Sequence, residues 1–155
     1  MLEAIFRTRT SGPRALHINR FFPPATVRVL LDESGQVLSD KVSFGGLARN
    51  LRHVKKGVAR NLIRERQQQL RTLFDQAEQE ADKALPAMTE QAQQQMMQQL
   101  GDEIARLEAL AKRNPAVRAE EIEALREERR ALSDTIAGTR LQLDAVRGIV
   151  TVDPK

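Results

Sequence analysis

The residues best able to do chemistry in this chain are the cations of a short basic stretch, residues 49–71, in which eight Lys and Arg accompany a single acid, Glu65. Several of them fall three or four positions apart, so a helix would align them in a stripe able to follow a phosphate backbone. No aromatic residue interleaves them, so base stacking is not indicated, and a plain solvated face is the competing interpretation. The candidate nucleic-acid contacts are Arg49, Arg52, Lys55, Lys56, Arg60 and Arg64.

Catalytic and cofactor chemistry finds little support. Cys is absent, which excludes disulfides and thiolate metal sites. His17 and His53 each lack a nearby second His or a plausible Ser partner, so neither is expected to be a metal ligand or a general base. Gly45-Gly46 lacks the spacing and the Lys of a phosphate-binding loop. We therefore predict no catalytic, cofactor-binding or metal-binding residue in this chain.

The composition predicts one domain with an aliphatic core. A chain of 155 residues matches one ordinary domain, and with 3% aromatics and no Trp its core must consist of Leu, Ile, Val, Ala and Met. There is no leader peptide and no run of about 18 apolar residues, so we expect a cytoplasmic protein without a membrane partner. The net charge of the chain is +4, and its positive charge is concentrated in the N-terminal part, because residues 1–56 carry ten Lys and Arg against four acids.

The opening third predicts a small antiparallel β platform. Turn residues Ser11-Gly12-Pro13 and Pro23-Pro24 separate apolar runs, which gives strands near 2–9, 15–22 and 26–31. Residues 149–152 look like a final strand that returns to the platform. Four apolar residues of the platform could be core or an exposed docking surface: Phe21, Phe22, Val27 and Val29.

The remaining residues predict helices. Ser43 can cap a short helix over about 44–54, and apolar residues then recur at threes and fours over about 58–111. Pro86 predicts a kink or break between residues 82 and 87. The link after Ala111 is short, so a second helix over about 119–146 should pack antiparallel on the first. The predicted seam contains Leu100, Ile104, Leu107, Ile122, Leu125, Leu132 and Ile136.

The fold class is therefore α+β, mostly α. Within a single domain over 1–155, we expect a β platform over 1–42, a helical stalk over 43–147, and a terminal strand and tail over 148–155. The chain starts abruptly at a strand, which suggests a fragment of a larger protein.

Dispersed sequence blocks carry a family resemblance that spans nearly the whole chain. The blocks are Leu2-Glu3-Ala4-Ile5-Phe6, Arg20-Phe21-Phe22-Pro23, Glu121-Ile122-Glu123-Ala124 and residues 143–150. They resemble the C-terminal region of the RapA family of bacterial RNA polymerase-associated ATPases, which are SWI/SNF-type proteins. Pro86 and Gly148 depart from the family pattern, which leaves helix continuity and the last strand open.

The resemblance implies a parent protein that is a DNA-dependent, helicase-like ATP hydrolase, a transcription regulator and activator that recycles RNA polymerase. ATP and Mg²⁺ would belong to that parent, because none of its motor motifs maps onto residues 1–155. This chain would be the non-catalytic, accessory C-terminal domain of that parent. Its partners would be RNA polymerase core, the upstream ATPase lobes, and DNA or RNA backbone. A bacterial, nucleoid-associated location would follow.

Three functions are compatible with the sequence. The first is a docking or bracing domain of the transcription ATPase. The second is a nucleic-acid clamp that uses the basic stretch 49–71. The third is a free-standing coiled-coil adaptor that dimerises through the 122–146 seam.

Overall fold

The computed structural model describes residues 1–151, which form two compact units. The first, here called the sheet unit, contains residues 1–7, 26–84 and 142–151. The second, here called the hairpin unit, contains residues 8–25 and 85–141.

A three-stranded antiparallel sheet in the order β2-β1-β3 lies at the centre of the sheet unit. Its strands are β1 (Leu2–Arg9), β2 (Thr26–Leu31) and β3 (Arg140–Gly148). The register of β1 with β2 runs from Leu2 opposite Leu31 to Arg7 opposite Thr26. The predicted strands at 2–9 and 26–31 are confirmed.

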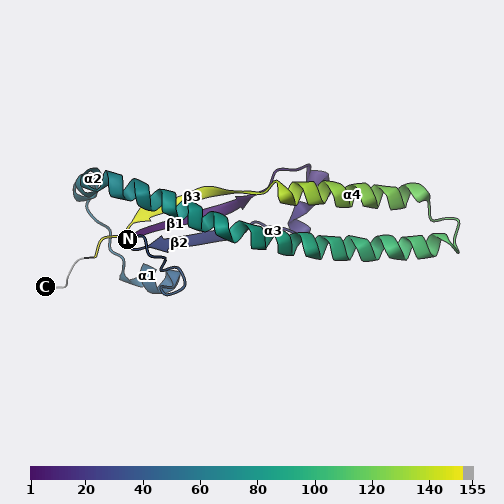
Figure 1. Ribbon diagram of the computed structural model, residues 1–155, viewed down its shortest axis with the longest axis horizontal. Coiled ribbons are helices and arrows are strands. Elements are labelled where there is room, and N and C mark those ends of the chain that lie inside the picture. The colour runs from purple at the N-terminus through teal and green to yellow at the C-terminus, as the bar shows by residue number, and fades with distance from the viewer. Residues whose placement is uncertain (152–155) are drawn as a thin grey trace. The chain divides into compact units, whose positions relative to one another are not determined.

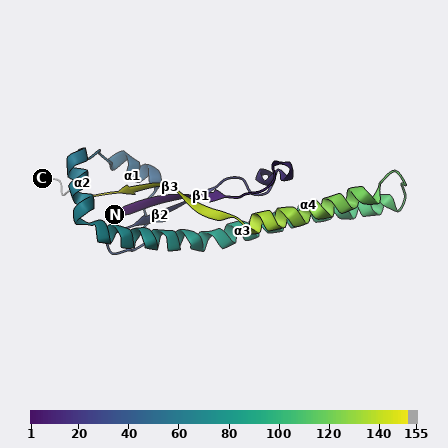
Figure 2. The same cartoon turned by 90° about the horizontal axis from the view of Figure 1, so that it is seen from above.

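Helices cover both faces of this sheet. Alternation along β1 places Leu2, Ala4 and Phe6 on one face and Glu3 on the other. Figure 2 shows the beginning of α3 along one side of the sheet and α1 (Phe44–Asn50) on the other. The core cluster on the α1 side contains Leu30, Leu47 and Ile149, with Met1, Leu38, Val42 and Leu51 packed against it.

Helix α1 begins where the sequence predicts and ends earlier. The Ser43 side chain accepts a hydrogen bond from the Gly46 backbone N–H at 3.1 Å, which confirms the cap. Leu51 adopts an extended backbone conformation and packs against the core cluster, so the helix stops at Asn50 rather than near residue 54.

The long helix predicted over 58–111 is two helices, α2 (Lys56–Glu65) and α3 (Gln67–Ala111), separated at Arg66. Polar residues fill every position from 64 to 69, so no apolar side chain holds this segment straight against a core. Helix α2 consequently turns away from the direction of α3 (Figure 2).

The hairpin unit confirms the predicted antiparallel helix pair. The last part of α3 and α4 (Ala119–Ala137) lie side by side, joined by a short turn (Figure 1). Its core cluster contains Phe21, Phe22, Ala92, Met96, Leu100, Leu132 and Ile136. Hydrogen bonds also join the helices, because Gln93 Nε2 donates to the Ser133 carbonyl at 2.8 Å and Ser133 Oγ donates to Gln93 Oε1 at 2.9 Å.

The strand predicted over 15–22 is wrong. The segment forms two 3-10 turns, Arg14–Leu16 and Ile18–Arg20, around His17 in the left-handed region at φ 46°. The two aromatic residues that suggested a strand, Phe21 and Phe22, pack into the core of the hairpin unit. Burial against helices replaces strand pairing here.

The boundary predicted between the second helix and the last strand is also wrong. Helix α4 ends at Ala137 rather than near residue 146, since Gly138 and Thr139 end the helical hydrogen bonding. Residues 140–148 form β3, and residues 149–151 lie beyond it. The Met1 backbone still pairs with Ile149 through two hydrogen bonds of 2.9 Å. Residue 152 of the predicted strand, and the predicted tail after it, lie outside the described residues.

Pro86 does not break α3, which continues through it from Gln67 to Ala111. Proline lacks the N–H that would bond the carbonyl four residues earlier, and its ring crowds that carbonyl.

We expect Pro86→Ala to raise the free energy of unfolding by about 1–2 kcal/mol, a part of the ~3 kcal/mol cost of a helix-interior proline. Urea denaturation followed by circular dichroism would measure it, and a destabilised variant would contradict this account of α3.

Candidate docking groove and basic stretch

The six predicted cations are all exposed in the sheet unit. Arg49 lies in the last turn of α1, Arg52 and Lys55 lie in the connection to α2, and α2 carries Lys56, Arg60 and Arg64. Over residues 1–151, no Asp or Glu oxygen lies within 4.0 Å of these six cationic groups. The basic stretch is therefore available to an anionic partner.

Helix α2 has a pronounced apolar side, yet none of its ten residues is buried. Leu62 is half-buried and Ile63 is 58% exposed. An amphipathic helix normally buries its apolar side against a core. In α2 that side instead borders a groove.

The groove has a volume of about 920 Å³ and lies within the sheet unit. Its walls are the end of α1 and the α1–α2 connection, α2 itself, the first turns of α3, and the end of β3 with the residues after it. The volume falls within the range of about 300–1,000 Å³ that is typical of small-molecule pockets. Aliphatic and aromatic side chains dominate its lining: Leu51, Val54, Leu62, Ile63, Leu70, Leu73, Phe74, Val146, Ile149 and Val150.

Several large apolar side chains of this lining are open to solvent. Val54 is 48% exposed, Val146 50% and Val150 48%. Single exposed apolar residues are ordinary, but their convergence with Ile63 on one hollow marks a candidate interaction surface.

The rim of the groove is predominantly basic. Arg52, His53, Arg66, Arg71 and Arg147 line it, against two acids, Glu33 and Asp75, and Arg147 is itself paired with Glu3. Arg66 approaches Glu33 only at 3.9 Å, and both side chains are exposed, so this pair is weak.

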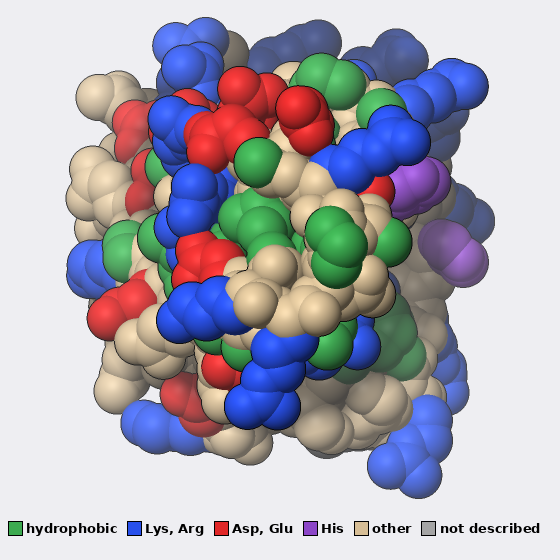
Figure 3. Space-filling view, turned by 90° about the vertical axis from the view of Figure 1, so that its right-hand side faces the viewer, with side chains coloured by type: hydrophobic (Ala, Val, Ile, Leu, Met, Phe, Trp, Pro, Cys, Tyr) green, Lys and Arg blue, Asp and Glu red, His purple; other side chains and the backbone are tan. Residues whose placement is uncertain are grey.

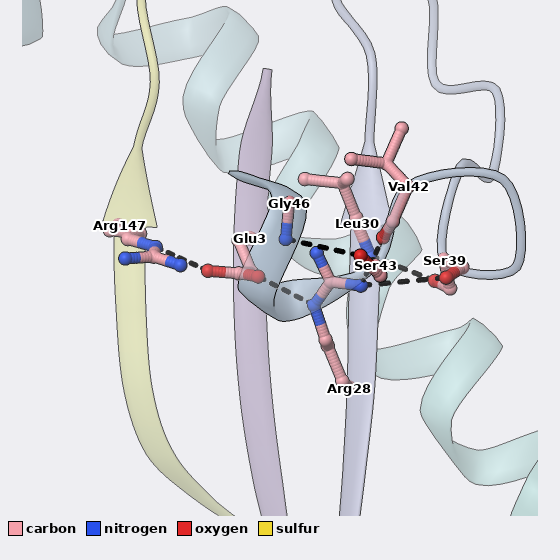
Figure 4. A network of polar contacts seen from close by, with 8 residues as sticks. All are labelled: Glu3, Arg28, Leu30, Ser39, Val42, Ser43, Gly46 and Arg147. Atoms are coloured by element: carbon pink, nitrogen blue, oxygen red, sulfur yellow. Dashed lines mark hydrogen bonds and ion pairs between the residues drawn. The ribbon is translucent and has the colours of Figure 1, made fainter. Parts of the chain in front are cut away.

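A second polar constellation lies on the α1 side of the sheet and joins all three strands (Figure 4). The carboxylate of Glu3, which is 1% exposed, accepts hydrogen bonds from Arg28 Nε at 2.6 Å and from Arg147 Nε. Arg28 Nη1 also donates to the Val42 carbonyl at 2.6 Å, and the ring of Phe44 lies 5.3 Å from the Arg147 guanidinium. The arrangement fastens β2, β1, β3 and the segment before α1 to one another.

Burial by itself would raise the pKa of the Glu3 carboxyl, because a charged form is poorly solvated there. The hydrogen bonds and positive charges of Arg147 and Arg28 outweigh that effect, and the net pKa lies below its ordinary value. Glu3 is therefore a structural anion. Sequence reasoning missed it, although a lone acid inside the apolar run Leu2–Phe6 was a usable signal.

The predicted docking residues belong to the interior. Phe21, Phe22 and Val29 are buried and Val27 is half-buried, so the structure places the first three in the core. The seam residues lie along α3 and α4 inside the hairpin unit. Among them Leu100, Ile104, Ile122, Leu132 and Ile136 are buried, and Leu107 and Leu125 are half-buried.

The end of the hairpin unit where α3 turns into α4 differs from the basic stretch in its charge. Figure 3 shows Lys, Arg, Asp and Glu side chains interspersed there around apolar ones. Arg126 illustrates this mixture, since it pairs with Glu108 at 2.6 Å and with Glu123 at 3.0 Å. No single sign of charge dominates this end.

Gly45 and Gly46 lie in the first turn of α1, where Ser43 caps the Gly46 N–H, and no Lys accompanies them. Residues 1–151 contain no group of three or more His, Asp or Glu side chains that could hold a metal ion. Across the same residues, no helix is long and apolar enough to span a membrane.

The chain is an α+β module with an open groove in its sheet unit, and sequence comparison places it in a family. Residues 1–151 match the model of the RNA polymerase recycling family C-terminal domain. The chain belongs to this family.

A relative illustrates the match. The chain is 37% identical over 150 residues to the RNA polymerase-associated protein RapA of Photobacterium profundum. The aligned region is 97% of this chain and 15% of the relative, so the chain spans a small part of the length of that protein.

Proposed function

We propose that this chain is a non-catalytic docking domain of an RNA polymerase-associated protein. The groove of the sheet unit carries the proposal, because exposed apolar side chains converge on it and such a surface is typical of an interaction site. Family membership and the name of the RapA relative support RNA polymerase as the partner. In a longer parent protein the domain would also brace the lobes of an ATPase, where ATP and Mg²⁺ would act.

A binding measurement with RNA polymerase core tests the docking role. Residues 1–155 carrying a fluorescent label should bind purified core enzyme in a saturable manner, as measured by fluorescence anisotropy. Unlabelled chain should compete with the labelled one. If the chain does not bind core enzyme, and the parent protein lacking these residues binds it as well as the intact parent, the docking role is wrong.

A nucleic-acid clamp is the second candidate, favoured by the six exposed cations without a nearby acid. Each Lys or Arg that neutralises a duplex phosphate contributes about 0.9 to the slope of log K against log salt concentration. Replacing Lys55, Lys56, Arg60 and Arg64 by Gln should therefore flatten the slope for double-stranded DNA by about 3.6 if all four contact phosphates.

These four residues do not line the groove, so the variant leaves the groove lining unchanged. A matched control replaces four exposed cations of the hairpin unit, Arg106, Lys112, Arg113 and Arg118, by Gln. An unchanged slope in the first variant, or an equal change in both, would rule out a clamp formed by the basic stretch.

The adaptor hypothesis is disfavoured by the packing of its own seam. Leu132 and Ile136 are fully buried in the core of the hairpin unit, and residues 140–148 are a strand rather than helix. Little of the proposed dimer seam is left for a second chain.

A further inference from the structure

The open groove raises the question of what covers it. Ile63 and Val54 are about half exposed, and α2 buries no residue at all. The apolar side of α2 thus lacks the core contact that such a helix normally has. The groove has the features of a surface awaiting a partner.

The charge around the groove indicates which sign of charge the partner should carry. The basic residues that line it are Arg52, His53, Arg66, Arg71 and Arg147, of which Arg147 is already paired with Glu3, and the acidic ones are Glu33 and Asp75. The excess of Arg at the rim is reinforced by the exposed cations on α2 just beyond it. Complementary potential steers association and disfavours partners of like charge, so an acidic partner fits best.

The lining selects the kind of molecule. The apolar lining of the groove is mostly aliphatic, and its aromatic rings are those of Phe74 and His53. Nucleic-acid grooves instead combine cations with several stacking aromatics. Apolar side chains of a protein segment would fill this volume, with acids at its flanks.

The walls also favour a helical segment over an extended one. Most of the wall is formed by side chains of α2, of α3 and of the α1–α2 connection. A helix satisfies its own backbone hydrogen bonds and needs only side-chain contacts. An extended peptide would need backbone partners, which α2 and α3 do not offer and which the edge strand β3 offers only where its end reaches the groove.

We infer that the groove binds an amphipathic acidic helix of a partner protein, with apolar residues at positions i, i+3, i+4 and i+7 and Asp or Glu beside them. This inference rests on the proposed docking function and specifies its partner surface. Ile63 would contact the apolar side of that helix, and Arg52 and Arg71 would face its acids.

A designed peptide is the probe. It is an 18-residue helix labelled with fluorescein, with Leu at the four spaced positions and Glu at the flanks. Two matched peptides carry Lys in place of every Glu, or the same composition in scrambled order. The intact chain should bind the acidic helix at least tenfold more tightly than either, as measured by anisotropy.

Two variants on α2 make the test specific to the groove. Ile63→Asp should weaken binding of the acidic peptide at least tenfold, since it places a charge in the lining. Val58→Asp should leave binding unchanged, because Val58 is similarly exposed at 51% but does not line the groove. Both residues are exposed, so circular dichroism should show both variants folded.

A double variant tests the charge. Replacing Arg52 and Arg71 by Glu should lower affinity for the acidic peptide and raise it for the Lys peptide. Equal binding of the acidic, Lys and scrambled peptides, or equal effects of Ile63→Asp and Val58→Asp, would overturn the inference. Sedimentation showing a dimer that Ile63→Asp dissociates would also overturn it, by identifying a second copy as the occupant.

The outcome is separable from that of the docking test. If core enzyme binds wild type and Ile63→Asp equally while the acidic peptide does not bind, docking stands and the groove inference falls. If the acidic peptide binds as expected and core enzyme does not, the groove inference stands and the proposed RNA polymerase partner falls.

Discussion

Replacing Glu3 by Gln is expected to lower the free energy of unfolding by about 2–3 kcal/mol. Removing one partner of a buried ion pair typically costs about 3–5 kcal/mol, and we reduce that figure because the Arg147 side chain is 37% exposed. The loss arises because Arg28 and Arg147 keep their charges beside a carboxamide that cannot balance them. Chemical denaturation at neutral pH measures the difference.

Glu65→Gln is the matched control, since Glu65 is an exposed acid of the same unit and its substitution should change stability by less than about 0.5 kcal/mol. A double-mutant cycle with Arg147→Gln isolates the pair. Additive effects of Glu3→Gln and Arg147→Gln would show that the ion pair contributes nothing to stability.

The same substitution should change the pH dependence of stability. The folded pKa of Glu3 is lower than the unfolded pKa, so between the two values the unfolded chain binds more protons. The contribution of Glu3 is therefore complete above the ordinary Glu pKa and is lost as pH falls through the folded pKa. The stability gap between wild type and Glu3→Gln should shrink as pH is lowered through this window, and a gap that widens would contradict the assignment.

Periodicity in the sequence was sufficient to predict the helix pair. Apolar residues three and four apart run through α3 and α4, and a linker too short for a crossover requires an antiparallel arrangement. Residues 141–146 satisfy two periods at once, since Leu143 and Val146 continue the heptad while Leu141, Leu143 and Ala145 alternate as in a strand. Strand pairing with β1 decided between them.

Long-range features were not predictable in this way. Glu3 and Arg147 are 144 positions apart, and neither carries a local signal for the other. The groove depends on the interruption of the helix at Arg66, because there the chain changes direction and α2 leaves the direction of α3. The basic stretch was visible in the sequence because charge is a local property, whereas the hollow it borders is a product of tertiary packing.

Leu132→Ala is expected to destabilise the chain by about 3 kcal/mol, within the range of about 2–5 kcal/mol for buried Leu to Ala substitutions. Leu132 is fully buried in a cluster with Met96, Leu100, Phe21 and Phe22. The substitution removes apolar contacts and leaves a cavity that the two helices cannot close without losing their packing against the segment after the 3-10 turns.

Two further variants separate packing from helix propensity, and urea denaturation followed by circular dichroism compares all three. Leu110→Ala is the control, because Leu110 is 45% exposed at the end of α3 and its replacement should cost well under about 1 kcal/mol. Leu132→Met keeps most of the volume and should cost less than about 1.5 kcal/mol. A loss in Leu132→Ala no larger than in Leu110→Ala would show that the seam does not hold the hairpin unit together. If the loss of stability is largest for Leu132→Ala, smaller for Leu132→Met and smallest for Leu110→Ala, the stability of the hairpin unit depends on the packing of α3 against α4.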